Sequence, residues 1–174
     1  MYISKYKPIK GKRKPVILAK DGGFNIGGDG KISDPADIYR MFAEIGVCED
    51  TEERFWMISL NGSSRIKGIF ELSHGNAYST TVNPRGMAQR MLLGDAVEII
   101  TVHNHPSGDC LPSNDDIGVC KKIARLCELL DVGFADNIIV GGEEYFSFRQ
   151  FGMMDECKRQ GRIEMKRDIL KRMG

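Results

Sequence analysis

The chain has 174 residues, 41% of them hydrophobic, which suits one domain with a core of ordinary size. Its 25 basic and 24 acidic side chains nearly cancel, so the sequence does not indicate a protein that binds polyanions through its overall charge. No apolar segment is long enough to span a bilayer, and the lysine-rich N-terminus lacks the apolar region of a secretory signal. Five cysteines without a Cys-x-x-Cys pair favour a reducing compartment, so we expect a cytoplasmic protein.

The sequence pattern divides the chain into a basic, glycine-rich arm with short strands, a central domain and a charged C-terminal helix, at residues 1–32, 33–152 and 153–174. Within the arm, residues 1–14 are expected to be irregular because many of their side chains are Lys or Arg.

Hydrophobic periodicity and turn residues predict mixed strands and helices in chain order. Asp34 followed by Pro35 marks the start of a helix, and Gly46 marks its end. Strands are expected at 16–19, 55–60, 66–72, 77–82, 97–103, 137–140 and 145–148, and further helices at 84–93, 114–130 and 157–173. This alternation indicates an α/β fold with a mixed β-sheet flanked by helices.

Two of the three histidines, His103 and His105, lie one residue apart at the end of the apolar run Ile99–Val102. Residues i and i+2 of a strand point to the same side, so both imidazoles can converge where the predicted strand ends.

A turned loop follows the histidines, because Pro106, Gly108 and Pro112 restrict the backbone there. Ser113 then opens a helix, which places Asp116 in its first turn, facing back toward the strand end. Two nitrogens and one oxygen with an open coordination position are typical of a catalytic zinc site.

Simpler interpretations of the same residues remain open. His103 and His105 could be loop residues or hydrogen-bonded core residues. Asp116 could only cap the helix or interact with its dipole, although Asp115 could take that role and leave Asp116 free to bind metal. Cys110 lies in the same loop and could add a ligand.

The spacing of His103, His105, Ser113 and Asp116 resembles the metal-binding signature of the JAMM (JAB/MPN-type) metalloproteases. The fuller string HNHPSGD…PS…D resembles the RadC branch of that superfamily, over roughly residues 33–152. The resemblance implies a cytidine-deaminase-like/JAB-MPN fold and a zinc-dependent hydrolase that cleaves a peptide or isopeptide bond.

The resemblance also implies catalytic residues outside the metal ligands. It assigns the general acid/base to Glu53, with Glu52 as the close competitor because a slip of one residue turns a side chain to the other strand face. It assigns stabilisation of the oxyanion to Ser113, which also fits a plain helix cap.

Some positions depart from the RadC pattern. Gly86 stands where relatives usually have glutamate, and Asn137 stands where they tend to have histidine. Asp136 could orient a ligating histidine through its other ring nitrogen, or be a turn residue. The helix-hairpin-helix segment often found ahead of this domain in RadC proteins is not expected here, which weakens an argument for direct DNA binding.

Three functional classes follow from these observations. The first is the zinc hydrolase, with a peptide or protein as substrate. The second is a DNA-associated RadC-like protein with a role in DNA repair or mobile elements, which would bind nucleic acid through the basic ends at 1–14 and 153–174. The third is a non-catalytic metal-binding scaffold. No membrane partner is expected, and the sequence leaves the oligomeric state open.

Overall fold

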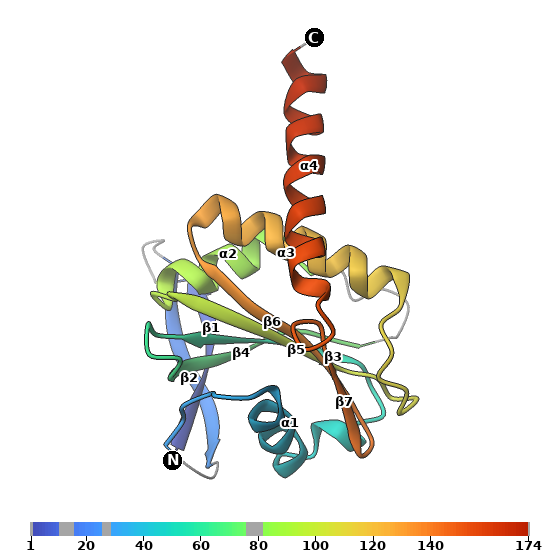
Figure 1. Cartoon of the computed structure of the whole chain (residues 1–174). Helices are drawn as coiled ribbons and strands as arrows, with labels where there is room; N and C mark the ends of the chain where they lie inside the picture. Colours follow the sequence, from blue (N-terminus) through green and yellow to red (C-terminus); the bar gives the residue numbers. More distant parts are fainter. Residues whose placement is uncertain (1, 11–15, 26–28, 76–81, 174) are drawn as a thin grey trace.

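A seven-stranded mixed β-sheet with helices on both faces forms the protein (Figure 1). The computed structural model describes residues 2–10, 16–25, 29–75 and 82–173. Across the sheet the strand order is β2-β1-β4-β3-β5-β6-β7. The strands are β1 (Tyr2–Lys10), β2 (Val16–Asn25), β3 (Arg54–Leu60), β4 (Ile66–His74), β5 (Glu98–Asn104), β6 (Gly133–Gly141) and β7 (Glu144–Ser147). The helices are α1 (Pro35–Glu44), the 3-10 turn η1 (Val47–Glu49), α2 (Pro84–Leu93), α3 (Asn114–Leu130) and α4 (Met153–Met173).

This architecture confirms the α/β class and the mixed sheet expected from the sequence. Helices α2 and α3 have the predicted bounds, and α1 begins at Pro35 after the Asp34 cap, as the capping residues indicate. Helix α4 begins at Met153, the first residue of the charged C-terminal segment, and so includes the predicted helical run from Cys157. The strand expected at 77–82 falls almost wholly outside the described residues.

The arm at the N-terminus differs from its prediction. Residues 2–10 were expected to be irregular, but they form β1, which pairs antiparallel with β2 and parallel with β4 through Lys5 and Ile69. Ile3 is buried in the core beneath α1. The lysines obscure the strand pattern of residues 2–10 in the sequence. A strand can nevertheless carry charged side chains at the alternate positions that face solvent.

Two hydrophobic layers sandwich the sheet, because successive residues of each strand point to opposite faces. On β5, Ile99 packs in the layer that includes residues of α2, α3 and α4, whereas Ile100 and Val102 pack in the layer that includes α1. Figure 1 shows α1 on one side of the sheet and the other three helices on the opposite side, with the end of α4 extending away from the sheet.

Strand β5 is central and positions the candidate site. It pairs antiparallel with β3, where Phe55 lies opposite His103, and parallel with β6, where Ile139 lies opposite His103. Its carboxyl end leads through a loop into α3, as in other parallel crossover units. Among the described residues, no helix has the combination of length and apolar character that crossing a bilayer requires.

Candidate metal centre

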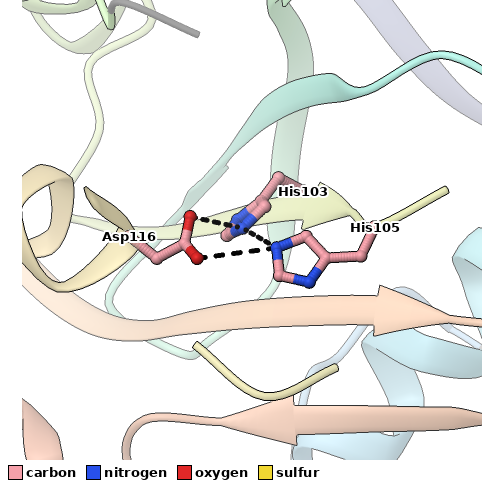
Figure 2. Close-up of side chains that lie close together, drawn as sticks. All are labelled: His103, His105 and Asp116. Carbon is pink, nitrogen blue, oxygen red and sulfur yellow. Dashed lines mark hydrogen bonds and ion pairs between the residues drawn. The ribbon is translucent and has the colours of Figure 1, made fainter. Parts of the chain in front are cut away.

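His103 and His105 point to one side of β5, as their i, i+2 spacing predicts (Figure 2). His103 is 1% exposed and stacks on Phe55 of β3, with ring centroids 5.5 Å apart and planes 13° apart. His105 lies just beyond the strand and is half-buried. Their Nε2 atoms are 3.2 Å apart, so the two imidazoles converge rather than project from a loop.

Asp116 faces both imidazoles from the first turn of α3. Its Oδ1 lies 3.1 Å from His103 Nε2, and its Oδ2 lies 3.5 Å from His105 Nε2. The same carboxylate closes a capping box, because Oδ2 accepts hydrogen bonds from the Ser113 backbone N–H (2.7 Å) and hydroxyl (2.6 Å). Asp116 thus caps the helix and faces the histidines at the same time. Asp115 need not take over the capping role for Asp116 to be available to a metal ion.

The three side chains fit a metal ion. Ligand atoms about 2 Å from a tetrahedral ion lie about 3.3 Å from one another, and the three separations here are 3.2, 3.1 and 3.5 Å. Within the described part of the chain, His103, His105 and Asp116 are the one group of three His, Cys, Asp or Glu side chains close enough to share an ion.

The ring nitrogens that face away from this centre differ between the two histidines. His105 Nδ1 lies 2.6 Å from the backbone carbonyl oxygen of Asp109, an acceptor that places the proton on Nδ1 and leaves the Nε2 lone pair for an ion. His103 Nδ1 is buried and has no hydrogen-bond partner among the described residues. The carbonyl acceptor could not be inferred from the sequence, because every residue carries one.

Electrostatics keep the carboxylate ionised and the His105 imidazole basic. Burial alone would raise the pKa of Asp116, but hydrogen bonds from His103, His105 and Ser113 outweigh it and hold that pKa well below its ordinary value. The interaction with Asp116 raises the pKa of His105 despite burial. The Asp116 carboxylate therefore remains ionised, and a metal ion bound here would have to displace a proton from His105 at low pH.

The carboxylates of Glu52 and Glu53 differ in whether they are paired. Glu53 immediately precedes β3, is half-buried, and its charge contributes to the raised pKa of His105. Its carboxylate makes no hydrogen bond or ion pair with any residue that the structure describes. Glu52 instead forms an ion pair with His74 at the end of β4. Of the two competitors, Glu53 is the one whose carboxylate is unpaired among the described residues and whose charge acts on His105.

The loop between β5 and α3 packs against the β6–β7 hairpin. A Cβ on Gly141 would lie 3.1 Å from the Gly108 carbonyl oxygen, so the close approach favours glycine at 141. Cys110 Sγ donates a hydrogen bond to the Glu144 carbonyl oxygen (3.1 Å), and burial raises the pKa of this thiol to about 11. Cys110 thus anchors the loop and is not part of the ligand cluster.

Asp136 does not orient a ligating histidine. It lies early in β6, where its Oδ1 accepts the backbone N–H groups of Asn137 (2.8 Å) and Arg149 (2.9 Å). Its Oδ2 accepts the Ser147 hydroxyl. The carboxylate is buried and fixes the chain after β7. From the sequence, Asp136 was expected to be either a partner for a ligating histidine or a turn residue, and neither interpretation includes this role.

Two departures from the RadC pattern lie outside the ligand cluster. Asn137 is buried on β6 and accepts a hydrogen bond from the Thr101 hydroxyl (2.7 Å), two residues before His103. Gly86 lies in the first turn of α2, where its carbonyl oxygen accepts a hydrogen bond from the half-buried Arg90 guanidinium (3.0 Å). Neither change removes a member of the ligand cluster.

The fold and the site define a mixed α/β protein with a candidate three-ligand metal centre at the end of its central strand. The family model described as the RadC-like JAB domain matches residues 32–153, and the chain belongs to this family. The match confirms the resemblance carried by the motif around His103 and Asp116.

Curated relatives are similar over 58–68% of the chain. UPF0758 protein YfjY of Escherichia coli (strain K12) is 35% identical over 102 residues, 59% of this chain and 64% of that protein. A UPF0758 protein of Coprothermobacter proteolyticus is 33% identical over 123 residues, 68% of this chain and 52% of the relative. A third, from Actinobacillus pleuropneumoniae, is 37% identical over 103 residues, 58% and 47% of the two chains. The chain spans about half the length of the curated relatives it matches, and their names state no activity.

Proposed function

We propose that the protein is a zinc-dependent hydrolase of the JAMM type that cleaves a peptide or isopeptide bond in a protein or peptide substrate. The observation that carries this proposal is the convergence of His103, His105 and Asp116 at ligand distances, with the charge of the unpaired Glu53 carboxylate acting on His105. His103, His105 and Asp116 would hold the ion, and the two imidazoles and one carboxylate match the ligands of hydrolytic zinc sites.

A zinc ion bound there would lower the pKa of a bound water to roughly 7. Glu53 would accept the proton of the attacking water and return it to the leaving amine. Its carboxylate has no competing partner among the described residues, and its role needs a side chain free to exchange a proton.

Ser113 would donate a hydrogen bond to the developing oxyanion. Its hydroxyl donates to Asp116 Oδ2 in this structure, but that oxygen also accepts the Ser113 backbone N–H at 2.7 Å. The hydroxyl could therefore turn to the substrate without leaving the carboxylate oxygen unpaired.

The test combines metal analysis with hydrolysis. Protein purified without chelators is expected to contain close to one zinc per chain, and a library of peptides and isopeptides followed by mass spectrometry would report cleavage. Glu53→Gln should retain zinc and lose hydrolysis by several orders of magnitude, whereas the matched control Glu52→Gln should keep both. Metal-free protein, or equal activity in the two variants, would contradict the proposal.

The DNA-associated alternative has less support. Several arginines near α4 are paired with acidic side chains: Arg159 with Glu156, Arg162 with Glu128, and Arg125 with Glu164 and Asp168. Such pairing reduces the local excess of positive charge that phosphate binding requires. No contact in the described structure favours DNA over a peptide substrate.

A further inference from the structure

We propose that Asn104, which lies between the two histidines, is a positioning residue for Glu53. Its side chain fixes the backbone of residues 50–54, and that backbone sets where the Glu53 carboxylate lies. This inference rests on the proposed hydrolase, and it assigns a role to the middle residue of the His-Asn-His sequence.

Asn104 points to the opposite face of β5 from the histidines and is fully buried, at 0% exposed. Its Oδ1 accepts the Arg54 backbone N–H at 2.8 Å. Its Nδ2 donates to the Glu52 carbonyl oxygen at 3.0 Å and lies 3.4 Å from that of Asp50. Both the oxygen and the nitrogen of the Asn104 amide thus form hydrogen bonds with one short segment, residues 50–54, which leads into β3.

The contacts of Asn104 fall on both neighbours of Glu53. The residue before it is held through its carbonyl oxygen and the residue after it through its N–H. Glu53 itself is fixed only at its backbone, where its carbonyl oxygen accepts the Gly75 N–H at 3.2 Å. No helix or strand includes residues 50–53, so side-chain contacts such as those of Asn104 restrain this segment.

This role requires the amide group and not only its volume. Aspartate has nearly the same shape and could still accept from Arg54, but it has no donor for the two carbonyl oxygens. Asn104→Asp would place a carboxylate against the Glu52 carbonyl oxygen, and the segment that carries Glu53 would shift away. Small displacements of a catalytic group can lower turnover by about 100-fold.

The experiment compares zinc-loaded wild type, Asn104→Asp and Asn104→Ala with the control Ser59→Ala. Ser59 is buried on β3 and donates to the Gly68 carbonyl oxygen at 3.3 Å, so its loss removes a buried hydrogen bond far from Glu53. We expect kcat to fall about 10- to 100-fold in both Asn104 variants with KM and zinc content nearly unchanged, and kcat to be unchanged in Ser59→Ala.

A double-mutant cycle separates positioning from a general structural effect. If Asn104 acts through Glu53, Asn104→Asp should have no further effect on the residual kcat of Glu53→Gln. If Asn104→Asp lowered kcat by the same factor in wild type and in Glu53→Gln, or did not lower the kcat of wild type, the proposal would be overturned. If Asn104→Ala does not fold, the isosteric aspartate variant still decides the question.

A second measurement does not depend on activity. Hydrogen exchange at the Arg54 amide should be faster by about tenfold or more in Asn104→Ala, which removes its acceptor, than in the wild type, while exchange at Met57 in the same strand stays unchanged. Unchanged exchange at Arg54 would overturn the positioning role. If the zinc-loaded wild type cleaves no substrate, the proposed function fails, and the exchange data alone then decide whether Asn104 holds this segment.

Discussion

Asp116 combines helix capping and membership of the candidate metal centre in one side chain. Its Oδ2 closes the capping box with Ser113, and its Oδ1 faces His103. Alanine at this position would remove both interactions together. Asparagine keeps an acceptor for the Ser113 backbone N–H but removes the negative charge, so it separates the two roles.

We expect Asp116→Asn to weaken zinc binding by more than about 100-fold. Loss of a residue that only orients a metal ligand typically costs about 10- to 100-fold, so a larger effect indicates a direct ligand. Competition with a chromophoric chelator at neutral pH would measure this affinity. Asp115→Asn is the matched control, because Asp115 is exposed in the same helical turn and outside the ligand cluster. Equal zinc affinity in the two variants would show that Asp116 is not a ligand.

Asp136 gives a pH dependence that is independent of the metal centre. Burial raises the pKa of its carboxyl, although hydrogen bonds from Ser147, Arg149 and Asn137 oppose the shift. The folded state therefore holds this proton more tightly than the unfolded chain, and Asp136 contributes less stability as pH rises from the ordinary value of 3.8 through the raised folded pKa.

Asp136→Asn mimics the protonated carboxyl and removes this dependence. The free energy of unfolding of the variant relative to wild type should increase as pH rises from about 4 to 7, since wild type alone loses the contribution. Urea unfolding of both proteins at several pH values would measure the difference. A gap between the two proteins that is constant with pH would contradict the raised pKa.

At the scale of elements, Gly86 weakens the first turns of α2. Glycine inside a helix is less favourable than alanine by about 1 kcal/mol. A Cβ at 86 would lie 3.2 Å from Arg90 Nη1 and 3.4 Å from Asn83 Nδ2, both at the ends of flexible side chains. The Arg90 guanidinium is half-buried, burial lowers its pKa, and no described residue forms an ion pair with it.

We expect Gly86→Ala to raise the free energy of unfolding by up to about 1 kcal/mol, and Gly86→Glu to raise it further, because the carboxylate lies near both Arg90 and the helix N-terminus. Gly118→Ala in α3 is the control, since a Cβ at Gly118 meets nothing within 4 Å. Chemical denaturation of the wild type and the variants would measure their free energies of unfolding. Gly86→Glu that is less stable than Gly86→Ala would contradict the predicted pairing with Arg90.

The elements that the sequence predicted well have local signals. Asp34 before Pro35, and Ser113 before Asp116, mark helix starts through hydrogen bonds that span only a few residues. Strand β1 was missed because its pairing partners, β2 and β4, lie elsewhere in the chain. The role of Asp136 was likewise hidden, since its partner Ser147 approaches only when the β6–β7 hairpin forms.

In the candidate site, too, local spacing could be interpreted from the sequence, whereas contacts between distant strands could not. His103, His105 and Asp116 could be grouped from their spacing because strand and helix geometry fixes their relative positions. Phe55 stacking on His103 depends on the register between β3 and β5, which spacing along the chain does not encode. The choice between Glu53 and Glu52 depends on that register too.

For the whole molecule, zinc should act as a stabilising ligand. An ion that binds the folded state at 100 times its Kd adds about 2.7 kcal/mol, which for a chain of this size raises Tm by about 5–10 °C. Calorimetry of chelator-treated protein with and without zinc would measure the shift. Asp116→Asn should show little shift under the same conditions, and a wild-type Tm that does not respond to zinc would contradict the metal centre.

All three candidate ligands belong to one continuous stretch of chain, from the end of β5 to the first turn of α3. Glu53 comes from a segment far earlier in the sequence and reaches them only when β3 pairs with β5. Closing a short loop costs less entropy than closing a long one, so this stretch can assemble before β3 docks. Under the proposed function, the chain can thus capture an ion during folding before the proposed acid/base Glu53 is in place.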